Sequence, residues 1–335
     1  MTEFRVVVVG LGFVSQFWLP TLLTRADVEV VAVVDPAADR PGPPCPRFEQ
    51  LDDALDAVEA NLVVNLTPPA LHREVVEAAL ERGCHVFGEK PMATTLEDAR
   101  ALVELAEQRG LTFAVMQNRR FVPAVRRLGE AVASGAIGEP VLSCADMFMA
   151  PRHRASYLSG MDSPLLREMA IHTFDQARFL AGAEPVAVTC VELDPPHSWY
   201  EGAATAIATF ELADGSMFSY RGSWVAPGFA TSYDAAWRIS GTRGTATWDG
   251  VGDPEVEVAL ERTEPYGEAP VERHVWPVEA TATGFEACID AVLDALRDGR
   301  PPETDCADTI RSLTMVFAAL RSSREQRRVL MNEFL

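Results

Sequence analysis

Short apolar runs alternate with amphipathic segments over the first third of this chain. Continuous, largely β-branched runs predict buried strands at residues 5–9, 29–34, 61–66, 85–87 and 111–116. Residues 71–82 and 96–109 place apolar side chains at helical spacing, and each segment ends at a glycine, Gly83 or Gly110, that suits a C-terminal cap. Strands that alternate with helices in this way predict an α/β fold with a doubly wound parallel sheet.

The pattern changes after about residue 120. Helices are predicted near residues 123–134 and 165–180, with a strand between them at residues 140–149. Further strands, joined by short turns typical of an antiparallel sheet, are predicted at residues 186–193, 203–212, 216–223 and 235–240. Two closing helices, at residues 285–297 and 308–323, are expected to pack back toward the first domain. We therefore predict a first domain at residues 1–120, and an α+β domain with a large, mainly antiparallel, open-faced sheet at residues 121–335.

Charge and cysteine usage exclude several classes of protein. A formal net charge of -20 repels nucleic-acid phosphates and anionic membranes, and no apolar run approaches the ~20 residues of a membrane-spanning helix. The first predicted strand begins too early for a signal peptide, and the six cysteines form neither a C-x-x-C pair nor a disulfide framework. We therefore expect a cytoplasmic protein with neither nucleic acid nor membrane as a partner.

The first turn between strand and helix reads Gly10-Leu11-Gly12-Phe13-Val14-Ser15, which gives the pattern G-x-G-x-x-S. Its glycines allow a tight turn and close backbone approach to a pyrophosphate at the helix N-terminus, which is typical of the Rossmann fold. Asp35 ends the second strand, where its carboxylate would accept hydrogen bonds from the adenosine ribose and repel a 2′-phosphate. NAD is therefore preferred over NADP, although Arg40 moderates that preference. The residues assigned to the cofactor on this basis are Gly10, Gly12, Phe13, Val14 and Asp35.

Five later segments follow one another in a characteristic order. They are residues 65–72 (NLTPPALH), 83–91 (GCHVFGEKP), 118–123 (NRRFVP), 135–138 (GAIG) and 168–175 (EMAIHTFD). Together they resemble the Gfo/Idh/MocA family, which includes glucose-fructose oxidoreductase and inositol 2-dehydrogenase, over nearly the whole chain. The resemblance implies NAD or NADP in the first domain and redox chemistry on sugars, inositols or related hydroxy compounds in a cleft against the second. It also implies that Thr67, Pro68, Glu89 and Lys90 line the cofactor, with His72 close by.

Lys90 follows a predicted strand at the sheet edge where open α/β folds bind ligands. A cation there can stabilise developing alkoxide charge and lower the pKa of a substrate hydroxyl. The ordinary alternative is a solvated loop lysine, but Pro91 restricts Lys90 to an extended backbone and the family resemblance favours function. Lys90 is therefore predicted as a catalytic and substrate-binding residue.

The segment at residues 168–175 places three titratable side chains on one helix face. His172 is the natural general base for a hydroxyl proton, and Glu168 would orient its imidazole or bind a neighbouring substrate hydroxyl. The family usually has Asp at position 168 and Gly at position 170, so Glu168 and Ala170 depart from its pattern. The first alternative is structural, a set of helix-surface charges or a histidine satisfied inside the core. A metal site is weaker still, because E-x3-H-x2-D matches no common zinc spacing and hydride transfer needs no metal. Asp175 is expected to be structural, pairing with Arg178 or capping backbone.

Three further side chains, Arg120, Arg154 and Tyr157, fall in segments that flank the inferred cleft and are predicted to contact a polyol substrate. The family commonly covers the open sheet face with another subunit, so a homodimer or homotetramer is expected.

Two alternatives to a simple dehydrogenase stay open. Some relatives use bound NAD transiently to eliminate or hydrolyse glycosides, and net nicotinamide reduction separates these reactions from dehydrogenation. The fold is also compatible with a non-catalytic, nucleotide-sensing binding protein.

Overall fold

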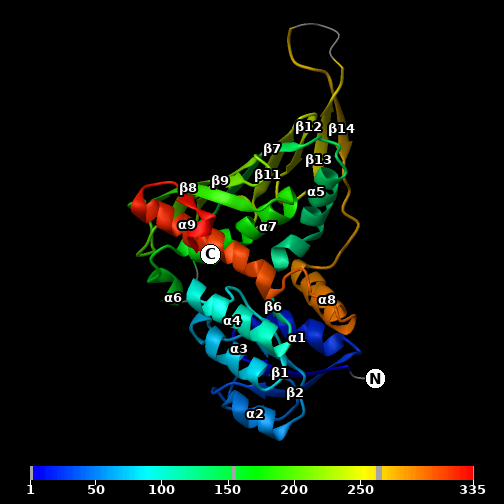
Figure 1. Cartoon of the computed structure of the whole chain (residues 1–335), viewed down its shortest axis with the longest axis vertical. Helices are drawn as coiled ribbons and strands as arrows, with labels where there is room; N and C mark the ends of the chain where they lie inside the picture. The colour runs from blue at the N-terminus through cyan, green and yellow to red at the C-terminus, as the bar shows by residue number, and fades with distance from the viewer. Residues whose placement is uncertain (1–2, 153–155, 262–265, 335) are drawn as a thin grey trace. The chain divides into compact units, whose positions relative to one another are not determined.

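The computed structural model describes residues 3–152, 156–261 and 266–334. Two compact units make up the chain (Figure 1). The first comprises residues 1–118 and 282–313, and the second comprises residues 119–281 and 314–335. The segment 282–313 therefore belongs with the first unit, whereas sequence patterns assigned it to the second domain.

The first unit contains a six-stranded sheet in which each paired strand runs parallel to its neighbour, in the order β3-β2-β1-β4-β5-β6. Its strands are β1 (Phe4–Val9), β2 (Val28–Val34), β3 (Arg47–Phe48), β4 (Leu62–Asn65), β5 (His85–Gly88) and β6 (Phe113–Val115). The central strands β1 and β4 are buried along almost their whole length, as a sheet covered on both faces requires. The order reverses between β1 and β4, the point where this fold binds ligands.

The helical segments of the first unit include α1 (Ser15–Thr24), α2 (Leu51–Ala57), η1 (Pro69–Leu71), α3 (His72–Glu81), α4 (Leu96–Arg109) and α8 (Gly284–Arg297). Side-chain caps begin two of them, α4 and α8. Helix α4 begins at a Thr95 cap and ends at Gly110, whose φ of +64° suits glycine. A reciprocal capping box between Thr283 and Glu286 starts α8.

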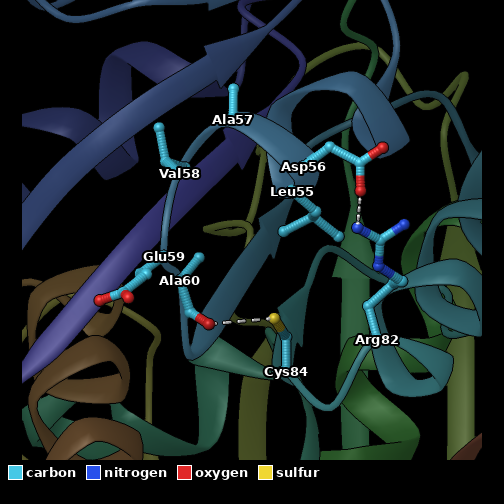
Figure 2. Close-up of a pocket in the computed structure, with 8 residues that line it drawn as sticks. All are labelled: Leu55, Asp56, Ala57, Val58, Glu59, Ala60, Arg82 and Cys84. Atoms are coloured by element: carbon cyan, nitrogen blue, oxygen red, sulfur yellow. Dashed lines mark hydrogen bonds and ion pairs between the residues drawn. The ribbon is translucent and has the colours of Figure 1, made fainter.

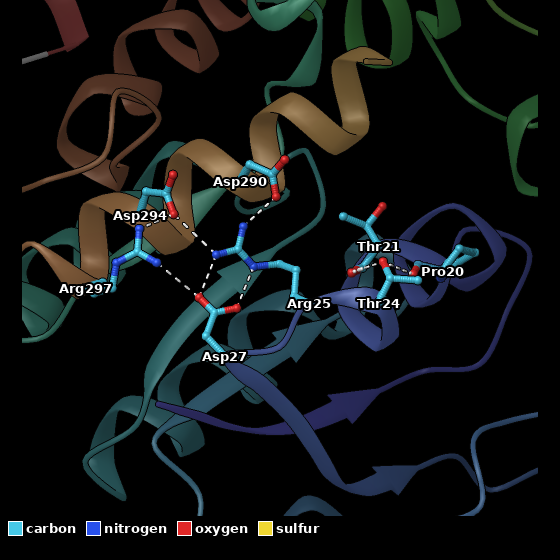
Figure 3. Close-up of polar contacts among 8 residues, drawn as sticks. All are labelled: Pro20, Thr21, Thr24, Arg25, Asp27, Asp290, Asp294 and Arg297. Atoms are coloured by element: carbon cyan, nitrogen blue, oxygen red, sulfur yellow. Dashed lines mark hydrogen bonds and ion pairs between the residues drawn. The ribbon is translucent and has the colours of Figure 1, made fainter. Parts of the chain in front are cut away.

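Helix α8 is fixed to the first unit by a charged cluster and an aromatic stack. Arg25, just after α1, donates to Asp27 and also to Asp290 and Asp294 on α8 (Figure 3). Phe17 of α1 stacks on Phe285 with ring centroids 5.5 Å apart. These contacts join α8 to α1 and to the residues just before β2 within this unit.

The second unit is built on a nine-stranded sheet in the order β14-β13-β12-β11-β7-β10-β9-β8-β15. The strands are β7 (Pro140–Phe148), β8 (Pro185–Leu193), β9 (Thr205–Leu212), β10 (Met217–Ser223), β11 (Ala236–Gly241), β12 (Gly244–Trp248), β13 (Glu255–Ala259), β14 (Val271–Val275) and β15 (Val329–Leu330). Strands β7 and β10 pair in parallel at the centre, and the other pairs are antiparallel. The predicted α/β fold with a large, mainly antiparallel second sheet is confirmed.

Helical segments of the second unit lie against one face of this sheet (Figure 1). They are α5 (Pro123–Ala133), a π-helical segment η3 (Leu165–Ala170) and α7 (Ile171–Ala181). The unit also contains the short segments α6 (Ser156–Ser159) and η4 (Met331–Phe334). Segment η2 (Asn118–Phe121) joins the two units, and α9 (Cys306–Glu325) begins in the first unit and ends in the second. Phe174 of α7 packs edge-on against Phe210 and Tyr220, with ring centroids 4.8 and 5.4 Å apart. This aromatic cluster forms the core beneath the sheet.

Candidate active site

The turn after β1 lets backbone approach a ligand. Gly10 has a φ of +96°, and a Cβ atom there would lie 2.8 Å from the carbonyl oxygen of Leu66, so the turn requires glycine. A Cβ at Gly12 would meet only the Arg40 guanidinium, at 3.7 Å, which is an ordinary contact. The protein itself therefore does not require glycine at position 12, and the space left open there suits a pyrophosphate.

Helix α1 begins at Ser15 without a side-chain cap at Val14. Ser15 is buried, and its hydroxyl donates to the Gly12 carbonyl at 2.7 Å. This hydrogen bond stabilises the turn. Phe13 is 77% exposed beside this helix end. An uncapped N-terminus offers amide donors and the positive end of the helix dipole to a phosphate. The turn therefore fits the dinucleotide that its sequence predicts.

Asp35 at the end of β2 is buried and holds the glycine turn in place. Its Oδ2 accepts from the amide of Leu11 at 2.7 Å and from Nη1 of Arg40 at 3.0 Å, and its Oδ1 accepts from the amide of Ala37 at 2.8 Å. Burial alone would raise the pKa of Asp35, but these hydrogen bonds and the Arg40 charge outweigh it, so the pKa lies below its ordinary value. Asp35 therefore stays ionised beside the adenosine end of the predicted cofactor site.

His72, which follows β4, connects two loops through hydrogen bonds of its ring. The two ring nitrogens of His72 lie 2.6 Å from the carbonyl oxygen of Pro91 and 2.8 Å from that of Thr67. Asn65 accepts from both the hydroxyl and the amide of Thr67. Pro68 is exposed at the start of η1. The predicted cofactor residue His72 is thus buried and joins the loops after β4 and β5, while Thr67 and Pro68 lie at the sheet edge.

The loop after β5 carries Glu89 and Lys90. Glu89 is buried, and one of its carboxylate oxygens accepts from the indole Nε1 of Trp18 at 2.7 Å. The other oxygen accepts from the backbone amide of Lys90 at 3.3 Å. The Lys90 side chain is half-buried and its peptide bond to Pro91 is cis. The loop therefore fixes the backbone that carries the lysine.

Lys90 is the only lysine in the chain. Lysine and arginine together number 29, so the other 28 basic residues of these two types are arginines. The two side chains differ because lysine is a compact point charge whose pKa can shift toward neutrality, whereas arginine stays charged. Position 90 is therefore the one place in this sequence where lysine stands and not arginine. This count is a sequence signal that motif reading alone overlooks.

The acidic and imidazole groups of the second unit lie on η3 and α7. Glu168 is half-buried within the π-helical segment, and His172 is 5% exposed in the first turn of α7. A π-helical segment has more residues per turn than an α-helix, so the predicted i,i+4 spacing does not by itself fix how these side chains face. The structure places Glu168 on η3 and His172 on α7, the helix that follows it directly in the chain.

Asp175 has a partner that local spacing does not predict. It binds Arg120 through both carboxylate oxygens, at 2.5 and 2.8 Å, and both side chains are buried. Arg178 pairs with Glu184. The pair of Arg120 and Asp175 joins η2 to α7. The substrate contact expected of Arg120 stays a prediction.

The remaining predicted substrate residues, Arg154 and the side chain of Tyr157, lie outside the described residues. Among the residues that the structure describes, no group of three or more His, Cys, Asp or Glu side chains could hold a metal ion. Nor does any helix in the described ranges combine the length and apolar character needed to cross a membrane.

A hollow in the first unit lies away from the predicted cofactor edge (Figure 2). It is lined by residues 55–60 together with Arg82 and Cys84, which precede β4 and β5. It therefore opens at the amino edge of the parallel strands, opposite to the glycine turn. The arrangement of an open α/β sheet places ligands at the carboxyl edge instead.

Trp18 is a site residue that sequence reasoning missed. It is fully buried in the first turn of α1 and contacts Glu89 across 71 positions of sequence. An apolar helix position predicts only packing, so no local pattern pointed to this hydrogen bond.

Profiles of two protein domains match the chain. "Oxidoreductase family, NAD-binding Rossmann fold" matches residues 4–117, and "Oxidoreductase family, C-terminal alpha/beta domain" matches residues 130–331. The chain belongs to the Gfo/Idh/MocA family of oxidoreductases. The family resemblance is therefore confirmed, and the first unit is an NAD-binding Rossmann domain.

Named relatives of this Gfo/Idh/MocA oxidoreductase align over nearly its whole length. The rhizopine catabolism protein MocA of Rhizobium meliloti is 28% identical over 95% of both chains. Inositol 2-dehydrogenase of Rhizobium meliloti strain 1021 is 25% identical, over 97% of this chain and 98% of its own. An oxidoreductase from Agrobacterium radiobacter, solved with NAD+, L-tartaric acid and magnesium, superposes with a TM-score of 0.87 at 22% identity, over 100% of each chain. That likeness establishes the shared fold.

Proposed function

We propose that the protein transfers a hydride between NAD and a secondary alcohol or ketone of a sugar, inositol or related small molecule. Its family consists of oxidoreductases, and two relatives carry the names inositol 2-dehydrogenase and D-apiose dehydrogenase. The D-apiose dehydrogenase of Paraburkholderia graminis is 28% identical over 98% of this chain. Polyhydroxylated compounds are therefore the substrate class that we propose.

The observation that carries this proposal is the single lysine at the carboxyl edge of the NAD-binding sheet. Lys90 follows β5 directly, and its backbone amide is held by the Glu89 carboxylate. A lysine ammonium at this edge can donate a hydrogen bond to a reacting oxygen and stabilise the negative charge that develops there. A purely solvated lysine would not explain why arginine replaces lysine at every other basic position.

The proposed reaction divides the work among three side chains. Bound NAD supplies the hydride acceptor. In the oxidative direction the substrate C–H electron pair leaves as hydride while His172 accepts the hydroxyl proton. Lys90 stabilises the oxygen as its negative charge grows, and Glu168 either orients the imidazole or binds a neighbouring hydroxyl. The oxygen is left as a carbonyl, so electrons and protons balance.

NAD is the cofactor we propose over NADP. The ionised Asp35 carboxylate lies beside the turn and would repel a 2′-phosphate. Arg40 is paired with that carboxylate, so it offsets part of the repulsion. We therefore expect weaker, measurable binding of NADP. Titrating the purified protein with NADH and NADPH would test this order of affinity.

The function is tested by following nicotinamide absorbance with a pool of sugars, inositols, sugar acids and keto sugars, with NAD and NADP in parallel. We expect net nicotinamide reduction with at least one polyol, abolished in Lys90→Ala and His172→Ala. Full turnover in either variant would overturn the assigned roles. Glycoside cleavage without net reduction would indicate the eliminating alternative, and NAD binding without turnover on any compound would indicate a sensor.

We also propose that the protein forms homodimers or homotetramers through the open face of its second sheet. The face opposite α5 and α7 exposes apolar side chains on neighbouring strands, and Val191 and Ile207, which are paired in register, are 56% and 49% exposed. Monomers seldom expose apolar patches of this kind. Light scattering should therefore give a mass above one chain, and Ile207→Glu should lower it. A monomeric wild-type protein would refute this proposal.

A cytoplasmic location is proposed on the state of the cysteines. No cysteine among the described residues forms a disulfide, which is typical of a reducing compartment. Fractionation of the source cells would check it.

A further inference from the structure

A buried hydrogen bond joins α1 to the loop that carries Lys90. The indole of Trp18 is fully buried, and its Nε1 donates to Oε1 of Glu89 at 2.7 Å. Burying a carboxylate is unfavourable unless donors replace its water, so this contact fixes where the Glu89 side chain can lie. Two segments that are 71 residues apart in sequence are therefore held together by one polar contact.

The same carboxylate also holds the lysine backbone. Oε2 of Glu89 accepts from the Lys90 amide at 3.3 Å, so one carboxylate has Trp18 on one oxygen and Lys90 on the other. The Trp18 ring meets the Phe87 ring edge-on, with centroids 4.5 Å apart. Phe87 lies on β5, the strand that leads into the loop. Packing and hydrogen bonding together leave the indole little freedom to turn away from Glu89.

Trp18 also belongs to the helix whose N-terminus fits the pyrophosphate. Helix α1 starts at Ser15 without a side-chain cap, and Trp18 lies within its first turn. A ligand bound to backbone amides at this helix end would hold the first turn of α1, and through Trp18 it would hold Glu89 and the Lys90 backbone.

We propose that Trp18 is a positioning residue that couples occupancy of the dinucleotide turn to the placement of Lys90. The proposal rests on the catalytic role proposed for Lys90. Trp18 acts through Glu89, because its indole N–H reaches the carboxylate rather than the lysine. The ordinary alternative is that Trp18 merely fills the core beneath α1.

The single lysine makes a direct test possible. Protein labelled with 15N and 13C only in lysine gives one backbone amide signal and one set of side-chain signals, all from Lys90. We expect Trp18→Phe, which keeps the ring and removes the N–H, to shift the Lys90 amide signal in the free protein. The variant should also lose most of the change that NAD produces in that signal. NADH affinity should stay within about threefold of wild type, because the glycine turn is intact.

A matched control removes the same N–H elsewhere. Trp248 is also buried, and its Nε1 donates to the carbonyl of Gly252 at 2.7 Å in the second unit. Trp248→Phe should leave the Lys90 signals and their response to NAD unchanged. Equal shifts in the two variants would mean that the effect is a general loss of packing.

Glu89→Gln provides a second route if Trp18→Phe does not fold. The amide oxygen of Gln still accepts from Trp18, but its NH2 group cannot accept from the Lys90 amide. We expect the Lys90 signal to shift in this variant as well, and the double variant to shift little further. Lys90 signals identical to wild type in every folded variant, with and without NAD, would overturn the proposal.

The proposed function can fail separately from this inference. If Lys90→Ala keeps full turnover, the catalytic role falls, yet the lysine signal still reports whether Trp18 places that residue. If Lys90→Ala is inactive and the signal ignores Trp18, only the positioning role falls. Where both hold, Trp18→Phe should lower kcat on a polyol found in the pool by about tenfold and leave KM for NAD nearly unchanged.

Discussion

The predicted site residues of the first unit and those of the second unit are held in place by different kinds of contact. In the first unit, short loops at the ends of adjacent parallel strands are joined mainly by contacts to backbone, such as His72 to two carbonyl oxygens and Glu89 to the Lys90 amide. In the second unit, Glu168 and His172 are four positions apart on the successive helical segments η3 and α7. The geometry of the loops therefore determines where the first group of residues lies. The path of one helical segment determines where the second group lies.

This difference predicts which substitutions lower activity and which lower stability. Backbone contacts survive most side-chain changes, so the first unit should keep its cofactor turn when a single functional group is replaced. The second unit depends on a buried ion pair, Arg120 with Asp175, that holds α7 against η2. Removing one charge there leaves the other buried and unpaired. Activity losses are expected to dominate in the first unit and stability losses in the second.

The largest expected effect is that of Lys90→Arg. Arginine keeps the positive charge but presents a broad planar group in place of a compact ammonium, so the charge no longer lies at the reacting oxygen and kcat should fall by about 10³-fold, or roughly 4 kcal/mol in the barrier. NADH binding should change little, because the turn at Gly10 is untouched. Steady-state kinetics with NAD and a polyol from the substrate pool measure this. The reverse exchange, Arg100→Lys on the exposed side of α4, is the control and should be silent.

Arg120→Met should destabilise the second unit by about 3 kcal/mol, because Asp175 is left as a buried, unpaired carboxylate. Chemical denaturation followed by circular dichroism gives the free energy of unfolding. The double variant Arg120→Met/Asp175→Leu should recover most of the loss. A single variant as stable as wild type would show that the pair does not hold α7.

His172→Asn should lower kcat by about 10²-fold, or roughly 2.7 kcal/mol, by removing the proposed proton acceptor. NADH affinity should remain that of wild type, because His172 belongs to the second unit and the cofactor turn belongs to the first. Fluorescence titration with NADH measures the second point. A large loss of NADH affinity would break the proposed separation between the two groups of residues.

Arg25→Gln should have the smallest effect, about 1 to 2 kcal/mol on unfolding of the first unit, because its partners on α8 are partly exposed. Hydrogen bonds from Arg25 hold the pKa of Asp27 below its ordinary value, against the opposing effect of burial. A carboxylate with a lowered folded-state pKa stabilises the fold above about pH 4 and loses that contribution as the pH falls through the lower value.

The difference in unfolding free energy between wild type and Arg25→Gln should therefore be full at pH 7 and shrink in acid. Thermal melts from pH 7 to pH 3 measure it. Arg5→Gln, which removes an exposed pair with Glu29, is the matched control and should cost less at every pH.

Sequence patterns predicted the elements that carry strong local signals. The buried runs of β1 and β2 and the helix that ends at Gly110 appear close to their predicted places, because continuous apolar runs and a left-handed glycine are local properties. Strand β14 was missed because each of its residues is exposed, which leaves no alternation to read. The short α2, β3, β12 and β13 were missed as well.

Local sequence patterns did not predict contacts between residues that are distant in sequence. The parallel pairing of β7 with β10 depends on the order of strands in space, which periodicity does not encode. Arg120 meets Asp175 across 55 positions and Trp18 meets Glu89 across 71. The π-helical turns around Glu168 likewise follow from how η3 packs and not from its residue spacing. Sequence motifs therefore predict which residues belong to the site, whereas their contact partners depend on the tertiary structure.

Because the chain has a single lysine, reagents that modify side-chain amines act at one position. Apart from its α-amino group, Lys90 offers the only primary amine for acylating dyes, amine-coupled biosensor chips and glutaraldehyde cross-linking. If Lys90 is catalytic, random amine labelling of this enzyme becomes site-directed inactivation. Attachment chemistry should therefore address the thiols or an added tag.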